Sequence, residues 1–268
     1  MRHQDDFLKR YGNWALVVGA AKGIGAAFAK NLAQQGVNLV LADVAEEELK
    51  EITIQLEAEN KIAIKIVIVD LRDTDAHLKI MGAAITENCR LLIYNAAISA
   101  VRKFTDTSTN ELDSLLQVNV STQLKIVHAF ARHLKDKEQK GGILLMSSLA
   151  GLLGMQLVAA YGATKAFAWN LAEALHHELK PLGIDVSTCI AGATLSQTYL
   201  DTKPKYSGIK PQLQSCEEVA DYALKMLGSK AICISGFSNR LNYFFLTRVL
   251  PRKMAARIAN KVIGKMYG

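Results

Sequence analysis

The sequence WALVVGAAKGIG spans residues 14–25 and joins an apolar run of strand length to a glycine-rich turn. A tight turn from a strand into a helix accepts glycine readily, because glycine has no Cβ. A helix is predicted to follow at residues 24–35. This strand, turn and helix form the first unit of a pattern that recurs along the chain, and the unit therefore decides how the rest of the sequence is interpreted.

Six further apolar runs have the length of strands. They are NLVLA (38–42), IAIKIVIV (62–69), LLIY (91–94), ILLM (143–146), IDVSTCI (184–190) and AICIS (231–235). Helices are predicted between them at 45–58, 73–87, 109–136, 160–180 and 217–227. Strands that alternate with helices imply right-handed crossovers and a parallel sheet covered on both faces. We therefore predict a single doubly wound α/β domain with a seven-stranded, mostly parallel sheet flanked by helices.

Charge is distributed unevenly along the chain. There are 32 Lys and Arg residues against 25 Asp and Glu residues, which gives a formal net charge of +7. The last acidic residue is Asp221, and nine basic residues follow it. Residues 1–221 are therefore near neutral, which argues against nucleic-acid binding, because that function needs a basic face spread over the fold.

The cysteines and the N-terminal residues indicate the compartment. The 4 cysteines form no CxxC pair and have no metal-ligand spacing, so no metal site is expected and the thiols are expected to stay reduced. The N-terminal MRHQDDFLKRYG lacks the apolar core of a signal peptide, and a cytoplasmic protein is expected. The uncharged stretch 141–164 could span a bilayer by length, but its glycines favour a strand, a turn and a helix start.

The glycine-rich turn is a candidate phosphate-binding loop. Gly19, Gly23 and Gly25 would permit a tight turn, a close approach to a pyrophosphate and packing of the helix on the strand. The start of that helix, at Lys22 and Ile24, would face the phosphates. The spacing is GxxxGxG, and a tight turn that binds nothing would have a similar sequence.

Asp43 follows the second strand, where a carboxylate can hydrogen-bond an adenosine ribose. It could also cap the helix that begins near Ala45. A carboxylate there should repel a 2′-phosphate, whereas Lys22 beside the loop could attract one. We expect NAD to be preferred and NADP to be the alternative, since a carboxylate at hydrogen-bond distance outweighs a solvated lysine.

Two more strands end in candidate cofactor-binding residues. Asp70 and Leu71 follow the third strand, and Asn95 and Ala96 follow the fourth. The carboxyl ends of strands form the edge where open α/β sheets bind ligands. Alternatively, Asp70 caps the next turn and Asn95 is a turn former.

Ser148, Tyr161 and Lys165 form the strongest candidate for chemistry. Tyr161 and Lys165 are four residues apart on a predicted helix, so their side chains share one face. A nearby ammonium stabilises phenolate and lowers the pKa of a tyrosine from ~10 toward neutrality. The pair is a candidate general acid and base, and Ser148 could bind the substrate oxygen. An isolated YxxxK is more often an exposed helix face.

Together these motifs resemble the short-chain dehydrogenase/reductase family, from about Tyr11 to Asn239, and in particular its branch of 3-oxoacyl and steroid reductases. The resemblance implies a Rossmann-type domain at residues 1–239 and a catalytic tetrad. The tetrad residues are Asn119, Ser148, Tyr161 and Lys165. Tyr161 would exchange a proton with the substrate oxygen while hydride passes to or from nicotinamide, and Asn119 would support a water-mediated proton relay.

The resemblance has further implications. Lys165 would bind the nicotinamide ribose, and Gly192 and Thr194 would contact the nicotinamide. A homodimer or homotetramer is expected through helices 109–136 and 160–180. The chain departs from the family pattern without losing a group that does chemistry, at Val18, Tyr94, Ala97 and Ala191.

Apolar residues surround the predicted site. The candidates for substrate binding are Ser148, Leu149, Leu153, Val158 and Leu195, with Tyr199 on an irregular segment, 195–215, that is expected to be a lid. Such a wall suits a lipid-like, steroid or aromatic ketone or alcohol, although some of these residues could belong to the core.

Residues 240–268 are predicted to be a basic amphipathic helical extension. Met254, Ile258, Val262 and Met266 recur every four residues beside a stripe of cations, and Pro251 suits a helix start. Such a helix can bury its apolar side in an anionic membrane, so residues 251–268 are a candidate peripheral membrane contact. The alternative is packing on the body or on a partner subunit.

The predicted function is that of an NAD(P)-dependent oxidoreductase that interconverts a secondary alcohol and a ketone on a small apolar substrate. The alternative is a cofactor-sensing or lipid-associated binding protein that keeps the domain but has little catalysis.

Overall fold

The computed structural model describes residues 2–206 and 211–268. Within these residues one sheet has the strand order β3-β2-β1-β4-β5-β6-β7, and all neighbouring strands are parallel. The strands are β1 (Trp14–Val18), β2 (Asn38–Asp43), β3 (Ile64–Ile68), β4 (Leu91–Tyr94), β5 (Gly141–Ser148), β6 (Ile184–Ala191) and β7 (Ile232–Ile234). The predicted doubly wound fold is confirmed, and the sheet is parallel throughout.

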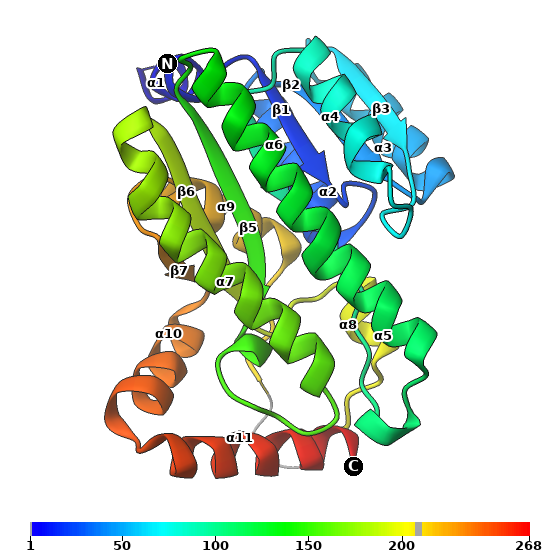
Figure 1. The fold of residues 1–268 in the computed structure, drawn as a ribbon, viewed down its shortest axis with the longest axis vertical. Helices are drawn as coiled ribbons and strands as arrows, with labels where there is room; N and C mark the ends of the chain where they lie inside the picture. The colour runs from blue at the N-terminus through cyan, green and yellow to red at the C-terminus, as the bar shows by residue number, and fades with distance from the viewer. Residues whose placement is uncertain (1, 207–210) are drawn as a thin grey trace.

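Helices cover both faces of the sheet (Figure 1). One face carries α2 (Gly23–Gln34), α3 (Glu46–Glu59) and α9 (Cys216–Met226), and the other carries α4 (Ala76–Thr86), α6 (Gln123–Asp136) and α7 (Ala159–Leu179). The remaining helices are α1 (Arg2–Tyr11), α5 (Thr109–Leu116), α8 (Gln197–Asp201), α10 (Phe237–Phe244) and α11 (Arg252–Tyr267). Neither α1 nor α8 is predicted from the sequence patterns.

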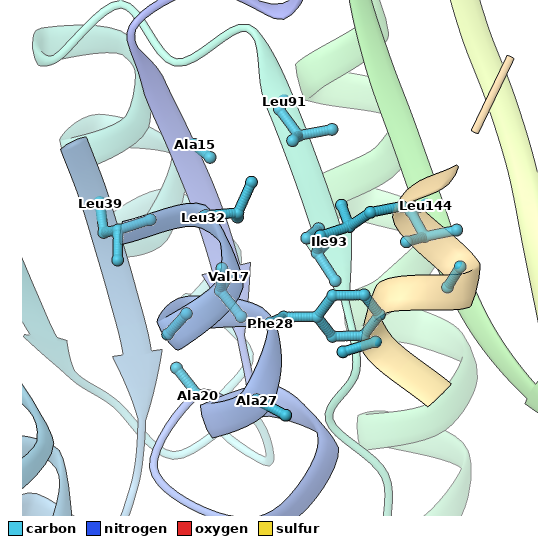
Figure 2. Packing of buried hydrophobic residues seen from close by; sticks show 14 of the residues in the cluster. Ala15, Val17, Ala20, Ala27, Phe28, Leu32, Leu39, Leu91, Ile93 and Leu144 are labelled. Carbon is cyan, nitrogen blue, oxygen red and sulfur yellow. The ribbon is translucent and has the colours of Figure 1, made fainter. Parts of the chain in front are cut away.

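The central strands are apolar on both sides. Successive side chains of a strand point to opposite faces, so in β1 Val17 packs against α2, whereas Leu16 and Val18 enter the core on the other face. Figure 2 shows Phe28 and Leu32 of α2 packed beside Val17. Burial on both faces is the reason that each strand appears in the sequence as a continuous apolar run.

The predicted helix 109–136 is divided by a π-helical segment. Residues Gln117–Thr122 adopt π-helical geometry between α5 and α6. Such segments occur often at functional sites, because they displace one side chain and one carbonyl from the regular helical pattern. Apolar periodicity does not reveal this interruption, since the residues on both sides keep a helical spacing.

The C-terminal residues pack on the body of the protein. The boundary predicted at residue 239 falls inside α10, which begins at Phe237 and continues into a second π-helical segment, Phe245–Val249. Ala255 and Ala259 of α11 are buried in a cluster with Leu152 and Leu153. The extension is therefore continuous with the main domain.

The uncharged stretch 141–164 is divided among β5, a turn and the start of α7. In the part of the chain that the structure describes, no helix has both the length and the apolar character needed to cross a membrane.

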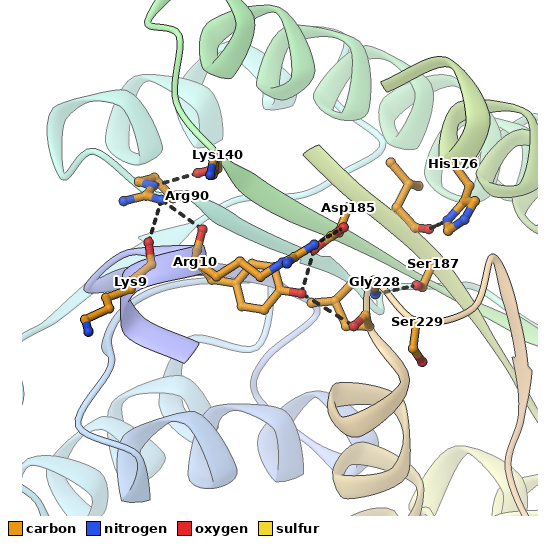
Figure 3. A network of polar contacts seen from close by, with 12 residues as sticks. Lys9, Arg10, Arg90, Lys140, His176, Asp185, Ser187, Gly228 and Ser229 are labelled. Atoms are coloured by element: carbon orange, nitrogen blue, oxygen red, sulfur yellow. Dashed lines mark hydrogen bonds and ion pairs between the residues drawn. The ribbon is translucent and has the colours of Figure 1, made fainter. Parts of the chain in front are cut away.

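The N-terminal helix is held by a polar network at the amino ends of the strands (Figure 3). The Arg10 guanidinium forms an ion pair with Asp185, and the Tyr11 hydroxyl donates to Asp185 Oδ2 over 2.8 Å. Asp185 is buried, while Arg10 is half exposed. Burial, followed by the Asp185 carboxylate, raises the pKa of the Tyr11 hydroxyl above its ordinary value. Because one carboxylate serves two partners, it links α1 to β6.

Asp185→Ala should lower the free energy of unfolding by about 3 kcal/mol, because it leaves a buried phenol and a cation without their shared acceptor. Urea unfolding followed by circular dichroism measures the change. As a control, Asp136→Ala removes only an exposed ion pair with Arg132 and should change stability little. Equal effects of the two substitutions would contradict a stabilising role for the network.

Candidate functional site

The carboxyl ends of the strands open into a cavity of about 1200 Å³. It includes the point between β1 and β4 where the strand order reverses, which is where open α/β sheets bind ligands. The predicted site residues that line it are Gly19, Lys22, Gly23, Ile24, Asp43, Asp70, Leu71, Asn95, Ala96, Ser148, Leu149, Leu153, Val158, Tyr161, Lys165, Gly192, Thr194 and Tyr199. The structure therefore brings nearly all of the predicted residues into one space.

Three predicted residues do not line this cavity. Gly25 lies beneath the loop, and Asn119 is buried with 2% of its surface exposed. Leu195 lines a separate cavity of about 290 Å³ with Lys30 and Gln55, so the structure does not bring it together with the other predicted substrate residues. Its backbone N–H donates to the carbonyl of Gln214.

The glycines of the loop are required by close backbone contacts. Gly19 has φ +80°, and a Cβ there would lie 2.6 Å from the Cα of Ala96. A Cβ on Gly25 would lie 1.7 Å from the carbonyl oxygen of Gly19. Asn95 Nδ2 donates to that same carbonyl over 2.9 Å. Asn95 therefore fixes the loop from the neighbouring strand end.

The first turn of α2 is open to an anion. Its N-cap residue, Lys22, makes no capping hydrogen bond through its side chain, and the turn has no acidic residue. In contrast, α5 and α9 both begin with a complete capping box, formed by Ser108 with Glu111 and by Ser215 with Glu218. The N–H groups of α2 and its helix dipole are thus available to the pyrophosphate of a dinucleotide, and the loop fits that group.

Asp43 supports the loop and also faces the cavity. Its Oδ2 accepts from the N–H of Ala21 over 2.9 Å, and its Oδ1 accepts from Val44 and Ala45 over 2.8 and 3.1 Å. The bonds from Val44 and Ala45 form a turn before α3, and the N-cap of α3 is Ala45 without a side-chain capping bond, so the alternative in which Asp43 caps that helix is not borne out. The carboxylate still lines the cavity at the end of β2.

The cations near Asp43 are paired with carboxylates. Lys22 Nζ lies 2.5 Å from Glu48, and Arg72 Nη2 lies 2.5 Å from Asp70. The Arg72 guanidinium holds the pKa of the Asp70 carboxyl below its ordinary value. Because Lys22 and Arg72 are paired with carboxylates, less positive charge is available to attract the 2′-phosphate of NADP.

The catalytic candidates meet where β5 ends and α7 begins. Tyr161 and Lys165 lie on one face of α7, and the Lys165 ammonium is 5.8 Å from the centre of the Tyr161 ring. Lys165 Nζ donates to the carbonyl of Met146 over 3.0 Å, which positions the buried amine against β5. Ser148 is the last residue of β5, and its hydroxyl accepts from the N–H of Ala150 over 3.2 Å and lines the cavity beside Tyr161.

Burial is the main cause of the pKa shifts of Tyr161 and Lys165. It raises the pKa of the Tyr161 hydroxyl, and the hydrogen bond with Ser148 opposes that rise only in part. Burial also lowers the pKa of Lys165 to about 8. The expected lowering of the Tyr161 pKa by Lys165 is therefore not found, because desolvation disfavours the charged form of both groups.

Asn119 connects three elements around the site. It lies in the π-helical segment, where its Oδ1 accepts from the N–H of Ile98 over 2.8 Å. Its Nδ2 donates to the carbonyl of Ile98 and to Thr164 Oγ1 over 2.9 and 3.0 Å. Thr164 in turn donates to the carbonyl of Tyr161 over 2.8 Å. The sequence analysis missed Thr164, although it lies inside the YGATK sequence.

Tyr94 is one of the positions at which the chain departs from the family pattern, and its contacts show what the tyrosine does there. It is the last residue of β4, is fully buried, and donates from its hydroxyl to the carbonyl of Val118 over 2.7 Å. Val118 precedes Asn119 in the π-helical segment. Tyr94 thus supports the segment that presents Asn119.

The C-terminal helices form a wall of the cavity that the sequence analysis did not assign to it. The lining residues from this region include Tyr243, Phe245, Leu246, Leu250, Ile258, Val262, Ile263, Met266 and Tyr267. The sequence feature that could have indicated this wall is the apolar residue at every fourth position in 254–266. Three of these residues, Ile258, Val262 and Met266, line the cavity.

Segment 195–215, which is expected to be a lid, is hydrogen-bonded to α11. Thr202 Oγ1 and the Tyr267 hydroxyl lie 3.0 Å apart, and the N–H of Lys205 donates to the carbonyl of Met266 over 2.9 Å. The hydroxyls of Tyr199 and Tyr206 are 2.9 Å apart. Residues 207–210 of the expected lid lie outside the described residues.

Stability should depend on pH through Lys165. Between pH 8 and its ordinary pKa of 10.5, the unfolded chain binds a proton on Lys165 that the folded chain does not bind. Stability should therefore rise with pH, by ~2 kcal/mol from pH 8 to pH 10. Urea unfolding should show that Lys165→Met removes this rise and that Lys180→Met, at an exposed position, keeps it. Parallel curves for wild type and Lys165→Met would contradict the lowered pKa.

Comparisons with known proteins agree with this geometry. A family model described as short chain dehydrogenase matches residues 13–206. The chain is 30% identical over 235 residues to the 7beta-hydroxysteroid dehydrogenase of Mediterraneibacter gnavus, covering 87% of this chain and 89% of that protein.

Two solved structures have the same fold and are similar in sequence. A structure from a study of 7beta-hydroxysteroid dehydrogenase stereoselectivity has a TM-score of 0.84 and 26% identity, and the match covers 94% of this chain and 98% of that one. A short-chain dehydrogenase from Sphingobium yanoikuyae in complex with NADPH has a TM-score of 0.74 and 25% identity, with coverage of 83% and 86%.

Proposed function

From the premise that the chain belongs to the short-chain dehydrogenase family, we propose that Tyr161 is the general acid and base of its reaction. The protein is an NAD(P)-dependent oxidoreductase that acts on CH–OH or C=O groups. The observation that supports the role of Tyr161 most strongly is the convergence of Ser148, Tyr161 and Lys165 in the cavity that also contains the open end of α2.

In the direction of ketone reduction, Tyr161 donates its proton to the substrate oxygen. Its raised pKa keeps the phenol protonated before this step, and Ser148 orients the carbonyl by a hydrogen bond. Lys165 would hold the ribose of a nicotinamide cofactor, which when bound would supply the hydride, and its ammonium would favour the phenolate that remains. Asn119 positions α7 through Thr164. Alcohol oxidation runs through the same groups in reverse.

Tyr161→Phe should reduce turnover by ~100-fold or more, because it removes the group that transfers the proton. A panel of apolar ketones and alcohols, followed by NADH absorbance, measures turnover, and fluorescence titration measures cofactor affinity, which should be unchanged. The control is Tyr222→Phe on α9, outside the cavity lining. A Tyr161→Phe variant that keeps most of the activity would refute the role of Tyr161.

The same panel tests the alternative function. A protein that binds cofactor or lipid without useful catalysis would show no turnover of any ketone or alcohol with either NADH or NADPH. The complete constellation of Ser148, Tyr161 and Lys165 favours catalysis.

We propose that NAD is preferred over NADP. The carboxylate of Asp43 lines the cavity at the end of β2, and Glu48 adds a second carboxylate beside Lys22. The Asp43 carboxylate would repel a 2′-phosphate, while Lys22 and Arg72 are already paired with Glu48 and Asp70. The NADPH in the Sphingobium yanoikuyae structure belongs to that protein and leaves the preference of this chain to experiment.

The wild-type protein should bind NADH roughly tenfold more tightly than NADPH, since a difference of ~1.4 kcal/mol suffices for that ratio. Glu48→Gln should narrow the preference, because it releases Lys22 to attract the 2′-phosphate. Glu46→Gln, on the same helix but paired with Lys50, should leave the preference unchanged. Fluorescence titration with both cofactors measures the ratio, and tighter binding of NADPH by the wild type would overturn the proposal.

The proposed substrate is a lipid-like, steroid or aromatic secondary alcohol or ketone. Leu149, Leu153 and Val158 line the cavity on one side, and the C-terminal helices line it on another. An apolar wall of this extent stabilises a hydrophobic substrate better than a sugar. The relative from Mediterraneibacter gnavus is named for a hydroxysteroid, which supports the same class.

A homodimer or homotetramer is proposed to form through α5, α6 and α7. Leu116 and Leu124 are exposed near the π-helical segment, with 52% and 43% of their surfaces accessible, and burial in a subunit interface would remove them from water.

A further inference from the structure

We propose that the outward face of α10 and α11 docks the protein on an anionic lipid surface. This docking face is defined by five exposed apolar residues, Phe237, Leu241, Phe244, Val249 and Met254, and by six exposed cations, Arg248, Arg252, Lys253, Arg257, Lys261 and Lys265. None of the five apolar residues lines the catalytic cavity. Figure 1 shows that the two helices form the end of the molecule opposite α1.

The apolar part of the docking face lies on α10. Phe237, Leu241 and Phe244 are spaced by four and three residues, so they form one stripe along the helix. Their exposed fractions are 74%, 47% and 52%. The other side of the same region faces inward, where Tyr243 and Leu246 line the cavity. The stripe is therefore exposed because the body already occupies the opposite side of α10.

The basic part lies on the outer side of α11. Lys253, Arg257 and Lys261 recur every four residues, opposite the buried Ala255 and Ala259. Within the described residues none of the six cations forms an ion pair. No acidic residue follows Asp221 in the chain, so the charged side chains of α10 and α11 are all basic.

This arrangement revises the membrane contact expected from the sequence. The apolar recurrence of α11 turns largely inward to the cavity, and the outward apolar residues come mainly from α10. The docking face therefore begins at Phe237, well before residue 251.

Charge favours a lipid surface over a second copy of the chain. A symmetric contact would place this face against itself and bring like charges together. Anionic headgroups instead neutralise the cations, while the apolar side chains enter the boundary between headgroups and acyl chains. Because the same helices wall the cavity on their inner side, docking would bring the cavity close to membrane-dissolved substrate. This last consequence rests on the proposed substrate class, whereas the docking itself does not.

Sedimentation with vesicles tests the docking, and it needs neither substrate nor cofactor. The vesicles are phosphatidylcholine alone or phosphatidylcholine mixed with phosphatidylserine. The full-length protein should bind the mixed vesicles, and added salt should weaken the binding. Lys253→Gln/Arg257→Gln/Lys261→Gln should weaken it roughly a hundredfold, and Phe237→Ser/Leu241→Ser/Phe244→Ser should also weaken it.

Matched controls alter similar residues elsewhere. Lys30→Gln/Lys61→Gln/Lys137→Gln changes three exposed lysines outside the docking face, and Ile54→Ser/Leu78→Ser changes two exposed apolar residues on α3 and α4. Both control variants should bind as the wild type does. Absence of wild-type binding to the mixed vesicles would overturn the proposal. So would an apolar-stripe variant that changes the oligomeric state in analytical ultracentrifugation but keeps vesicle binding, because that result identifies the partner as a second copy.

Discussion

The close contact between the Gly19 turn and its neighbours is the constraint on which the site depends. The backbone of Gly19 lies against Ala96 at the end of β4, and Gly25 lies against the carbonyl of Gly19 at distances that exclude a Cβ. This contact lets α2 begin immediately above the point where the strand order reverses. The cofactor end of the cavity therefore exists because two glycines bring a strand, a helix and a neighbouring strand end closer together than side chains would permit.

The catalytic end depends on a second constraint, which is the arrangement of hydrogen bonds around Asn119. The π-helical segment presents the Asn119 amide to Ile98 and Thr164, and Tyr94 holds the carbonyl of the preceding residue. Through Thr164 these bonds reach the backbone of Tyr161. Asn119 is buried and does not line the cavity, and its bonds connect it to the helix that carries Tyr161.

The C-terminal helices α10 and α11 lie between the cavity and the outer surface of the protein. Their inner sides complete the apolar wall of the cavity, and α11 holds the segment that contains Tyr199 and Thr202. Their outer sides carry the exposed aromatic side chains of α10 and cations that form no ion pair with any other residue that the structure describes. The positive charge of the chain is therefore concentrated on the C-terminal helices, which also line the cavity.

The sequence by itself determined the doubly wound sheet, the glycine-rich turn before α2 and the grouping of Ser148, Tyr161 and Lys165, because these follow from local periodicity and short spacings. Tertiary structure alone decided that Leu195 lines a separate cavity, that Asn119 hydrogen-bonds to Ile98 and Thr164, and that residues of α11 line the main cavity. It also decided that burial, and not the neighbouring ammonium, dominates the pKa of Tyr161. These properties depend on contacts between distant segments and on desolvation, which no short sequence pattern encodes.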